Sequence, residues 1–366
     1  MAVTKKNSTF ALVEKQRVII SESAARDLAA EIRVAAPDRL FILTDTNTRE
    51  QCLPVLAADD GMAALMDHAH IITIDAGDTH KTIESTAHVW RELGVHGGTR
   101  HSLMVNIGGG MVTDLGGFAA STFKRGIRYI NVPTTLLAMV DASVGGKTGV
   151  NFGGLKNEVG VFNNAESVIL DTVFLRTMDD ENIRSGYAEM IKHGLISSVS
   201  TWAQLLTFDL QKADLNALRD MVAESVSVKE RIVSEDPTEH GLRKALNLGH
   251  TAGHAFESLA MRRGTPVLHG YAVACGLVCE LFLSVLKTGF PAEKMRQTVT
   301  FIRENYGRMA ITCDDYDALI ELMTHDKKNT AGTINFTLLG DIGDIRIDNI
   351  ASKEEIREAL DFYREC

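Results

Sequence analysis

The sequence predicts an α/β fold for residues 1–178 and an all-α fold for residues 179–366 of a 366-residue chain. Short runs of β-branched and other apolar residues alternate with helical stretches through the first part. Longer stretches with a 3.6-residue apolar period, typical of helices, fill the second part. The length suits two domains of roughly 100–200 residues each. We therefore expect the domain boundary near residue 178, where the pattern changes.

Six apolar runs in the first part are expected to be strands of a parallel sheet, because strands buried on both faces show continuous Val, Ile and Leu. They are residues 17–20, 40–45, 70–75, 103–110, 129–135 and 167–171. Five amphipathic stretches in the second part are expected to be helices. They are residues 183–197, 215–234, 243–260, 269–287 and 292–306.

Composition excludes several kinds of partner. The 38 Lys and Arg residues against 48 Asp and Glu give a net charge of −10, and no long basic run offers a nucleic-acid surface. The N-terminus has no apolar segment of signal-peptide length, and Glu280 interrupts the longest apolar stretch, so no export signal or membrane span is expected. Five cysteines without a C-x-x-C pair favour a reducing cytoplasm. Cys275 and Cys279, one helical turn apart in an apolar run, are expected to pack in the core.

A glycine-rich loop follows the predicted strand at 103–110. Gly108, Gly109 and Gly110 precede a Gly- and Ala-rich helix, whose N-terminal N–H groups are suited to a phosphate, although a tight turn also explains the glycines. Asp45 and Asn47 follow another strand, where an acidic residue hydrogen-bonds ribose hydroxyls in dinucleotide folds. The G-x-G-x-x-G pattern is absent and the acid precedes the glycines, so we expect a topology different from the common Rossmann half.

A second glycine cluster contains a lysine. Gly146-Lys147-Thr148 resembles the end of a P-loop, but Asp141 stands where that motif requires its first glycine, which excludes a P-loop. Because Lys147 lies among small and apolar residues, a ligand contact is favoured over a solvated surface position. Arg125 is a candidate for the same kind of anion contact, with a plain surface position as the alternative.

Three histidines and a glutamate suggest a metal site. His250 and His254 are i,i+4 neighbours, a spacing at which two imidazoles can bind one ion, and His269 opens the next helix. Glu189 offers a carboxylate, although with Lys192 at i,i+3 it also fits an ordinary surface ion pair. Together the two halves predict an NAD-type cofactor, a divalent ion and a small anionic substrate, hence redox chemistry on an alcohol.

Five long motifs resemble the 3-dehydroquinate synthase family. They are residues 108–114, 133–151, 186–194, 239–257 and 268–276, within a similarity that covers most of residues 40–330 in order. The resemblance implies a Rossmann-like NAD-binding domain at 1–178 and an all-α domain at 179–366 that binds metal and substrate. It also implies a cytoplasmic homodimer that converts 3-deoxy-D-arabino-heptulosonate 7-phosphate to 3-dehydroquinate and phosphate, the second step of the shikimate pathway.

The resemblance also implies roles for individual residues. Glu189, His250 and His269 would bind Zn²⁺ or Co²⁺, whereas His254 would be catalytic and contact phosphate instead of the metal. NAD contacts would come from Asp45, Asn47, Asp78, Lys81, Gly109, Gly110, Asp114, Thr134, Thr135, Lys147, Lys156 and Thr177. Substrate contacts would come from Arg125, Asp141, Lys147, Asn157, Lys192, Lys229, Arg243, Asn247, His254 and Lys327, of which Arg125, Lys147, Asn157, Lys192 and His254 would take part in catalysis.

Three positions depart from the family pattern. Asp78 replaces a Glu, Thr113 replaces a Gly, and Tyr271 replaces a Glu close to His269. Asp78 keeps the carboxylate with a shorter reach, whereas Tyr271 affects the surroundings of a metal ligand. Three alternatives stay open: another sugar phosphate cyclase, an NAD- and metal-dependent polyol dehydrogenase, and a non-catalytic binding protein.

Overall fold

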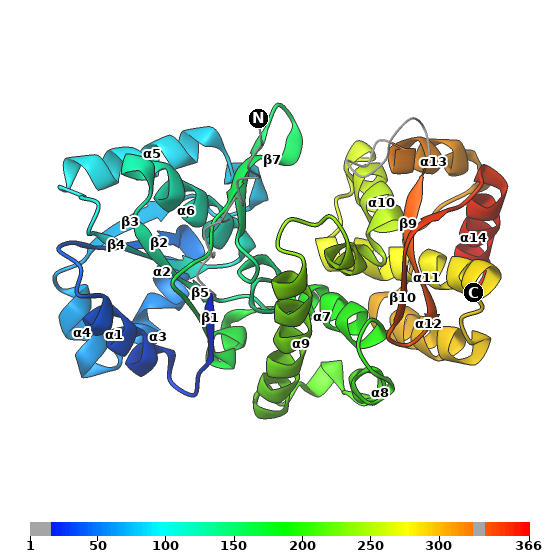
Figure 1. Ribbon diagram of the computed structural model, residues 1–366, viewed down its shortest axis with the longest axis horizontal. Coiled ribbons are helices and arrows are strands. Elements are labelled where there is room, and N and C mark those ends of the chain that lie inside the picture. The colour runs from blue at the N-terminus through cyan, green and yellow to red at the C-terminus, as the bar shows by residue number, and fades with distance from the viewer. Residues whose placement is uncertain (1–15, 325–333) are drawn as a thin grey trace, which may run out of the picture.

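A six-stranded parallel sheet is the centre of the first lobe of the protein, on the left of Figure 1. The structure is a computed structural model that describes residues 16–324 and 334–366. The strands are β1 (Arg17–Ile20), β2 (Leu40–Asp45), β3 (His70–Ile74), β4 (Leu103–Gly108), β5 (Arg128–Pro133) and β8 (Ser167–Leu170), in the spatial order β1-β8-β5-β4-β2-β3. Each strand falls on one of the six runs predicted from the sequence.

The strand order reverses between β2 and β4. From β2 the chain moves to β3 at the sheet edge and then returns to place β4 on the other side of β2, where Thr44 lies opposite Ile107. Numbered from β2, the order is 2-1-3-4-5, which confirms that the topology differs from the common Rossmann half. Ligands of such sheets bind beside the reversal, at the carboxyl ends of the strands. The fold thus brings Asp45, after β2, next to the glycine loop, after β4.

Helices cover both faces of this sheet (Figure 1). They are α1 (Ala24–Ala35), α2 (Thr46–Gln51), α3 (Leu53–Ala57), α4 (Asp60–Met66), α5 (Ile83–Val95) and α6 (Gly110–Thr122). Most of α6 is buried, because its Gly and Ala residues let it lie close to the strands.

An antiparallel ribbon that the strand prediction missed projects from the first lobe (Figure 1). It consists of β6 (Lys147–Phe152) and β7 (Leu155–Phe162). The alternation of glycine and polar residues in this segment hides the strand pattern. The ribbon carries Lys147, Lys156 and Asn157, so one element presents several of the predicted site residues.

The second lobe is helical, as expected. Its helices are α7 (Asp180–Leu195), α8 (Val199–Thr207), α9 (Leu215–Glu235), α10 (His250–Arg262), α11 (His269–Thr288), α12 (Ala292–Tyr306), α13 (Tyr316–Thr324) and α14 (Lys353–Glu365). Helices α8, α13 and α14 were not among those predicted, and two other features were not expected. An antiparallel pair, β9 (Asn335–Asp341) and β10 (Asp344–Ile350), packs on the helices, with Leu339 N donating to Ser284 Oγ at 3.1 Å. In addition, the helix predicted from residue 243 begins only at His250, because residues Leu242–Asn247 form a 3₁₀ segment.

Helix α11 is the central helix of this lobe. It is long and apolar enough to cross a membrane by length and composition, but 72% of its most apolar window is buried by the rest of the protein. Cys275 and Cys279 on α11 are 7% and 2% exposed, which confirms the prediction that they pack in the core. The apolar run is therefore explained by helix packing.

Candidate active site

Three side chains of the helical lobe converge on one point. Glu189 Oε1, from α7, lies 3.4 Å from His250 Nε2 and 3.5 Å from His269 Nε2, the first residues of α10 and α11. One donor atom of each residue lies within 4.8 Å of the other two. Glu189 is fully buried, and its Oε1 has no hydrogen-bonding partner. A buried acceptor without a partner, facing two imidazoles, fits a divalent ion with the carboxylate and histidine ligands that Zn²⁺ takes.

Helix crossings create this convergence. At Gly270, beside His269, an added Cβ would lie 1.8 Å from the carbonyl oxygen of Ser185, so only glycine allows α11 to meet α7 so closely. The left-handed Gly249 (φ +80°) starts α10 and orients His250. The sequence analysis treated Glu280 only as an interruption of an apolar run. Its buried carboxylate accepts from Gly249 N at 2.6 Å and Ala252 N at 3.1 Å, and so caps α10.

His254 lies one helical turn after His250, and its ring centroid is 5.3 Å from that of His250 and 6.0 Å from that of His269. Glu189, rather than His254, shares the point of convergence with the other two histidines. Of the two ligand sets considered from the sequence, the geometry therefore favours the one that includes Glu189. His254 remains beside the centre, within reach of a ligand bound there.

The charges around the centre favour a cation. Lys192 and Glu189 form an ion pair with side-chain exposures of 1% and 0%, so the surface-pair alternative is wrong. Burial opposes ionisation of Glu189, but Lys192, His250 and His269 hold the pKa of Glu189 well below its usual value. Burial also opposes protonation of His269, yet the carboxylates of Glu189 and Glu257 raise the pKa of His269 to about 10. The carboxylates therefore favour positive charge where a metal would lie.

A chain of polar contacts links this centre to the first lobe. His269 Nδ1 lies 3.4 Å from Glu257 Oε2, and Lys156 Nζ donates to Glu257 Oε1 at 2.8 Å. Lys156 Nζ also lies 3.6 Å from the carboxylate of Asp78. Carboxylates that hold the second nitrogen of a ligand histidine orient its ring. Motif spacing alone gives Glu257 no role, although its i,i+7 spacing from His250 places both on one face of α10.

The predicted nucleotide residues gather at the carboxyl ends of the strands. Gly109 is the N-cap of α6, and an added Cβ there would lie 3.0 Å from Thr135 Cγ2. Asp45 accepts from Thr48 N at 2.7 Å and caps α2, whose Asn47 is exposed. The N-terminus of α6 and these polar groups are suited to a nucleotide phosphate and ribose.

Two further pairs of predicted residues lie together at this edge. Thr134 and Thr177 lie beside the buried thiol of Cys52. Lys81, 4% exposed, donates to the carboxylate of Asp114 and to Asn157 Oδ1. Burial raises the pKa of Asp114, although Lys81 opposes this. Lys81 thus connects a predicted NAD contact to a predicted substrate contact.

Predicted substrate residues line the boundary between the lobes. Lys229 of α9 donates to the backbone oxygen and carboxylate of Asp141. Arg243 is 2% exposed, donates to Gly145 O at 3.1 Å, and has a buried Nε without a partner.

A glutamate that the sequence analysis did not assign lies among them. Glu239 accepts from Asn247 Nδ2 at 2.9 Å and pairs with Lys147. Its backbone is left-handed (φ +63°), a conformation that nothing in the sequence pattern indicates.

Two predicted residues are not brought into these contacts. Arg125 is exposed in the turn after α6 and makes no hydrogen bond or ion pair with the residues that the structure describes. Lys327 lies outside the described residues. Tyr271, one of the departures from the family pattern, packs on Tyr306 with ring centroids 5.2 Å apart.

The fold and the site define a class: two-lobe enzymes in which a nucleotide-binding sheet faces a metal centre on a helical lobe. Solved structures share this fold over most of the chain. A 2-deoxy-scyllo-inosose synthase complexed with carbaglucose-6-phosphate, NAD⁺ and Co²⁺ has a TM-score of 0.81 at 23% identity, covering 95% of this chain and 96% of that one. ValA, a 2-epi-5-epi-valiolone synthase from Streptomyces hygroscopicus with NAD⁺ and Zn²⁺ bound, has a TM-score of 0.81 at 25% identity, covering 100% and 99%. An iron-containing alcohol dehydrogenase from Thermococcus thioreducens shares the fold more distantly, with a TM-score of 0.66 at 18% identity, covering 96% and 99%.

The chain belongs to the 3-dehydroquinate synthase family. The family model described as 3-dehydroquinate synthase N-terminal matches residues 71–185, and the C-terminal one matches residues 186–329. The 3-dehydroquinate synthase of Parabacteroides distasonis is 54% identical over 353 residues, which are 96% of this chain and 99% of that protein. That of Leptospira interrogans is 41% identical over 291 residues, 79% of this chain and 80% of that protein.

Proposed function

We propose that the protein is a 3-dehydroquinate synthase that uses NAD and Zn²⁺ or Co²⁺ to convert 3-deoxy-D-arabino-heptulosonate 7-phosphate to 3-dehydroquinate and phosphate. The observation that carries the proposal is the convergence of Glu189, His250 and His269 on the helical lobe, joined through Glu257 to Lys156 of the nucleotide lobe. The family relationship supplies the particular substrate. A cytoplasmic homodimer is part of the same proposal and is supported by that relationship.

When bound, NAD accepts and returns hydride, and the divalent ion polarises an alcohol of the substrate. Glu189, His250 and His269 would hold the ion, and the residues around Asp45 and Gly109 would hold the nucleotide. Glu257 links His269 to Lys156 across the lobe boundary, so these residues would position a substrate alcohol between the two sets of ligands.

The cations at the boundary suit a substrate with a carboxylate and a phosphate. Lys229 and Arg243 are buried there, and Lys192 lies beside the metal ligands. Such fixed cations stabilise charge that develops on a departing phosphate better than water does, because they need no reorientation. Lys147 pairs with Glu239 in the structure, so we expect an anionic substrate group to exchange with that carboxylate. His254 is placed to contact the phosphate or to move a proton without binding the metal.

The test is phosphate release from 3-deoxy-D-arabino-heptulosonate 7-phosphate by the full chain with NAD and Zn²⁺, with NADH absorbance recorded at the same time. We expect release that a chelator abolishes, with no net NADH, because the hydride returns to the same substrate. Absence of release, with turnover of sedoheptulose 7-phosphate, would assign the protein to another sugar phosphate cyclase. Steady accumulation of NADH from simple polyols would assign it to a dehydrogenase.

A further inference from the structure

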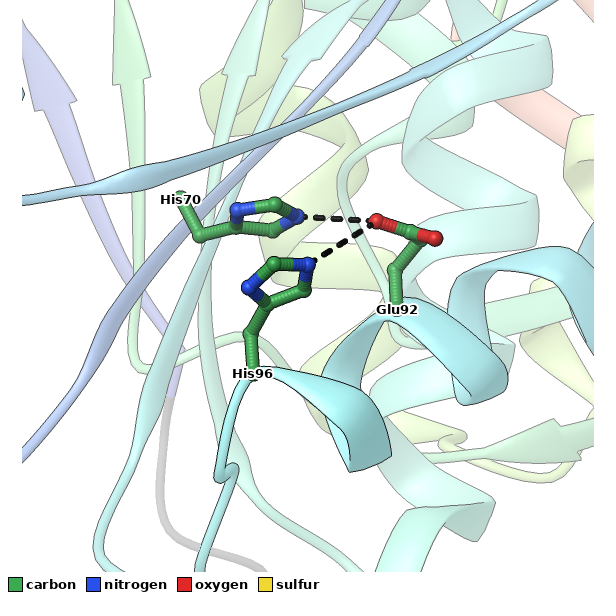
Figure 2. Close-up of side chains that lie close together, drawn as sticks. All are labelled: His70, Glu92 and His96. Carbon is green, nitrogen blue, oxygen red and sulfur yellow. Dashed lines mark hydrogen bonds and ion pairs between the residues drawn. The ribbon is translucent and has the colours of Figure 1, made fainter.

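A second group of metal-ligating side chains lies in the nucleotide lobe, away from the active site. It consists of His70, the first residue of β3, with Glu92 near the end of α5 and His96, which follows α5 (Figure 2). The strands are parallel and the nucleotide residues lie at their carboxyl ends. His70 is the first residue of β3 and therefore lies at the amino ends of the strands. Helix α5 begins just after Lys81 and has 13 residues, which separates the two sites by roughly 20 Å.

The three donor atoms point toward one another. Figure 2 shows a ring nitrogen of each histidine directed at the same carboxylate oxygen of Glu92. His70 Nε2 lies 2.9 Å and His96 Nε2 lies 3.6 Å from Glu92 Oε2. Ligands about 2.1 Å from a tetrahedral ion are about 3.4 Å from one another. The two separations lie on either side of that value, so small side-chain rotations would let the three atoms bind one ion.

The histidine rings are held in this orientation by their neighbours. The two rings stack on each other with centroids 3.5 Å apart, and the edge of the His70 ring meets Phe41 at 6.0 Å and 76°. Glu92 and His96 are also i,i+4 on one helix face. The donors are therefore ordered in advance, which reduces the conformational entropy lost when a ligand binds.

The ion pairs alone give little reason for such an arrangement. The side chains of His70, Glu92 and His96 are 29%, 31% and 43% exposed, and pairs this exposed are worth about 0–1 kcal/mol. Two imidazoles at 3.5 Å also repel when both are protonated. A divalent ion would satisfy all three donors and would still be reached from solvent, which leaves a coordination position for water.

We propose that His70, Glu92 and His96 form a second divalent-metal site that takes a borderline transition metal such as Zn²⁺. Two imidazoles and one carboxylate suit Zn²⁺, Co²⁺, Ni²⁺ or Cu²⁺, whereas Mg²⁺ and Ca²⁺ require an all-oxygen environment. An ion there would join the start of β3 to the end of α5. Its role is therefore to bind metal and to stabilise the outer edge of the nucleotide lobe, independently of the reaction at the active site.

The test is the zinc stoichiometry of the metal-stripped full chain after equilibrium dialysis against Zn²⁺, determined by elemental analysis. We expect two equivalents for the wild type and one for His96→Ala, with affinity at the second site reduced roughly tenfold or more. Glu92→Gln keeps the shape of the side chain but removes its charge, and should lose the same equivalent. His269→Ala should lose the other one, and the double variant with His96→Ala should bind none.

A matched control is His101→Ala, an exposed histidine of the same lobe outside the cluster, which should keep two equivalents. The circular dichroism spectra of all variants should match that of the wild type, and His96→Ala should keep wild-type turnover. A wild type that binds one equivalent would refute the proposal. So would two equivalents that persist in both His96→Ala and Glu92→Gln. Because the measurement counts zinc and not product, its result is independent of the proposed reaction.

Discussion

The buried Glu280 carboxylate offers a sharp test of how the helical lobe builds its metal centre. Glu280 is fully buried and accepts two hydrogen bonds, from Gly249 N at 2.6 Å and Ala252 N at 3.1 Å. These N–H groups belong to the N-terminus of α10, which begins at His250. Replacing Glu280 should therefore weaken both the fold and the position of a metal ligand.

The magnitude follows from the two hydrogen bonds. Bonds to a charged acceptor contribute about 1.5–3 kcal/mol each, so Glu280→Ala should lower the free energy of unfolding by about 3–6 kcal/mol. Glu280→Gln keeps one acceptor oxygen but turns an NH₂ group toward the other donor. We expect it to lose about half as much, roughly 1.5–3 kcal/mol. Zinc affinity should fall in both variants, because the first turn of α10 loses the group that fixes it.

The assay is urea unfolding followed by far-UV circular dichroism, combined with competition titration of zinc. The matched control is Lys287→Ala on the same helix, which breaks only the surface pair with Glu355 and should cost less than about 1 kcal/mol. Surface substitutions usually change the free energy of unfolding by less than about 0.5 kcal/mol. If the change for Glu280→Gln is no larger than this, and the variant binds zinc as tightly as the wild type, the capping role is refuted.

Three further predictions concern the site and its supports. Glu189→Ala or His269→Ala should abolish turnover and lose the active-site zinc equivalent together, whereas His254→Ala should keep that equivalent and lose rate; its loss in the last variant, measured by elemental analysis, would make His254 a ligand. Gly270→Ala should separate α11 from α7, because its Cβ would lie 1.8 Å from a backbone oxygen, and should reduce zinc content and melting temperature; a wild-type melting curve would contradict this close approach. Desolvation raises the pKa of Asp236, but three backbone N–H donors outweigh it and lower that pKa to about 2. The stability that this carboxylate adds is therefore present above its usual pKa of 3.8 and is lost as the pH falls toward 2. The urea midpoint of Asp236→Asn should be lower than that of the wild type at pH 5, and the difference should shrink in acid. A difference that stays constant with pH would refute the assignment.

Local sequence patterns were sufficient for much of the fold. Continuous apolar runs located the six strands of the parallel sheet. Strands such as β4 are buried on both faces and must be apolar throughout, whereas the edge strand β1 is only partly buried. The 3.6-residue period located the long helices of the second lobe in the same way. The ribbon of β6 and β7 and the pair of β9 and β10 were missed. The strands β7 and β10 lie at the surface and carry mixed polar and apolar residues, which hides the strand pattern.

The candidate site, like the fold, was predicted only in part from the sequence. Residue types and motif spacing indicated a nucleotide loop and a histidine-containing metal centre, and the family resemblance supplied the ligand set. Spacing alone favoured His250 and His254 as partners, because i,i+4 neighbours are the contacts that a helix defines locally. Whether Glu189 replaces His254 depends on how α7, α10 and α11 cross, which no local period encodes.

The sequence by itself determined most of the segments that form strands and helices, the net negative charge, and the kinds of donor available for a nucleotide and a metal. Only the tertiary structure decided which donors meet. It placed Glu257 behind His269, Glu239 between Lys147 and Asn247, and His70 against Glu92. The physical reason is that local periodicity reports which face of an element is buried, whereas a site forms where elements distant in the chain pack together, and that packing depends on the whole core.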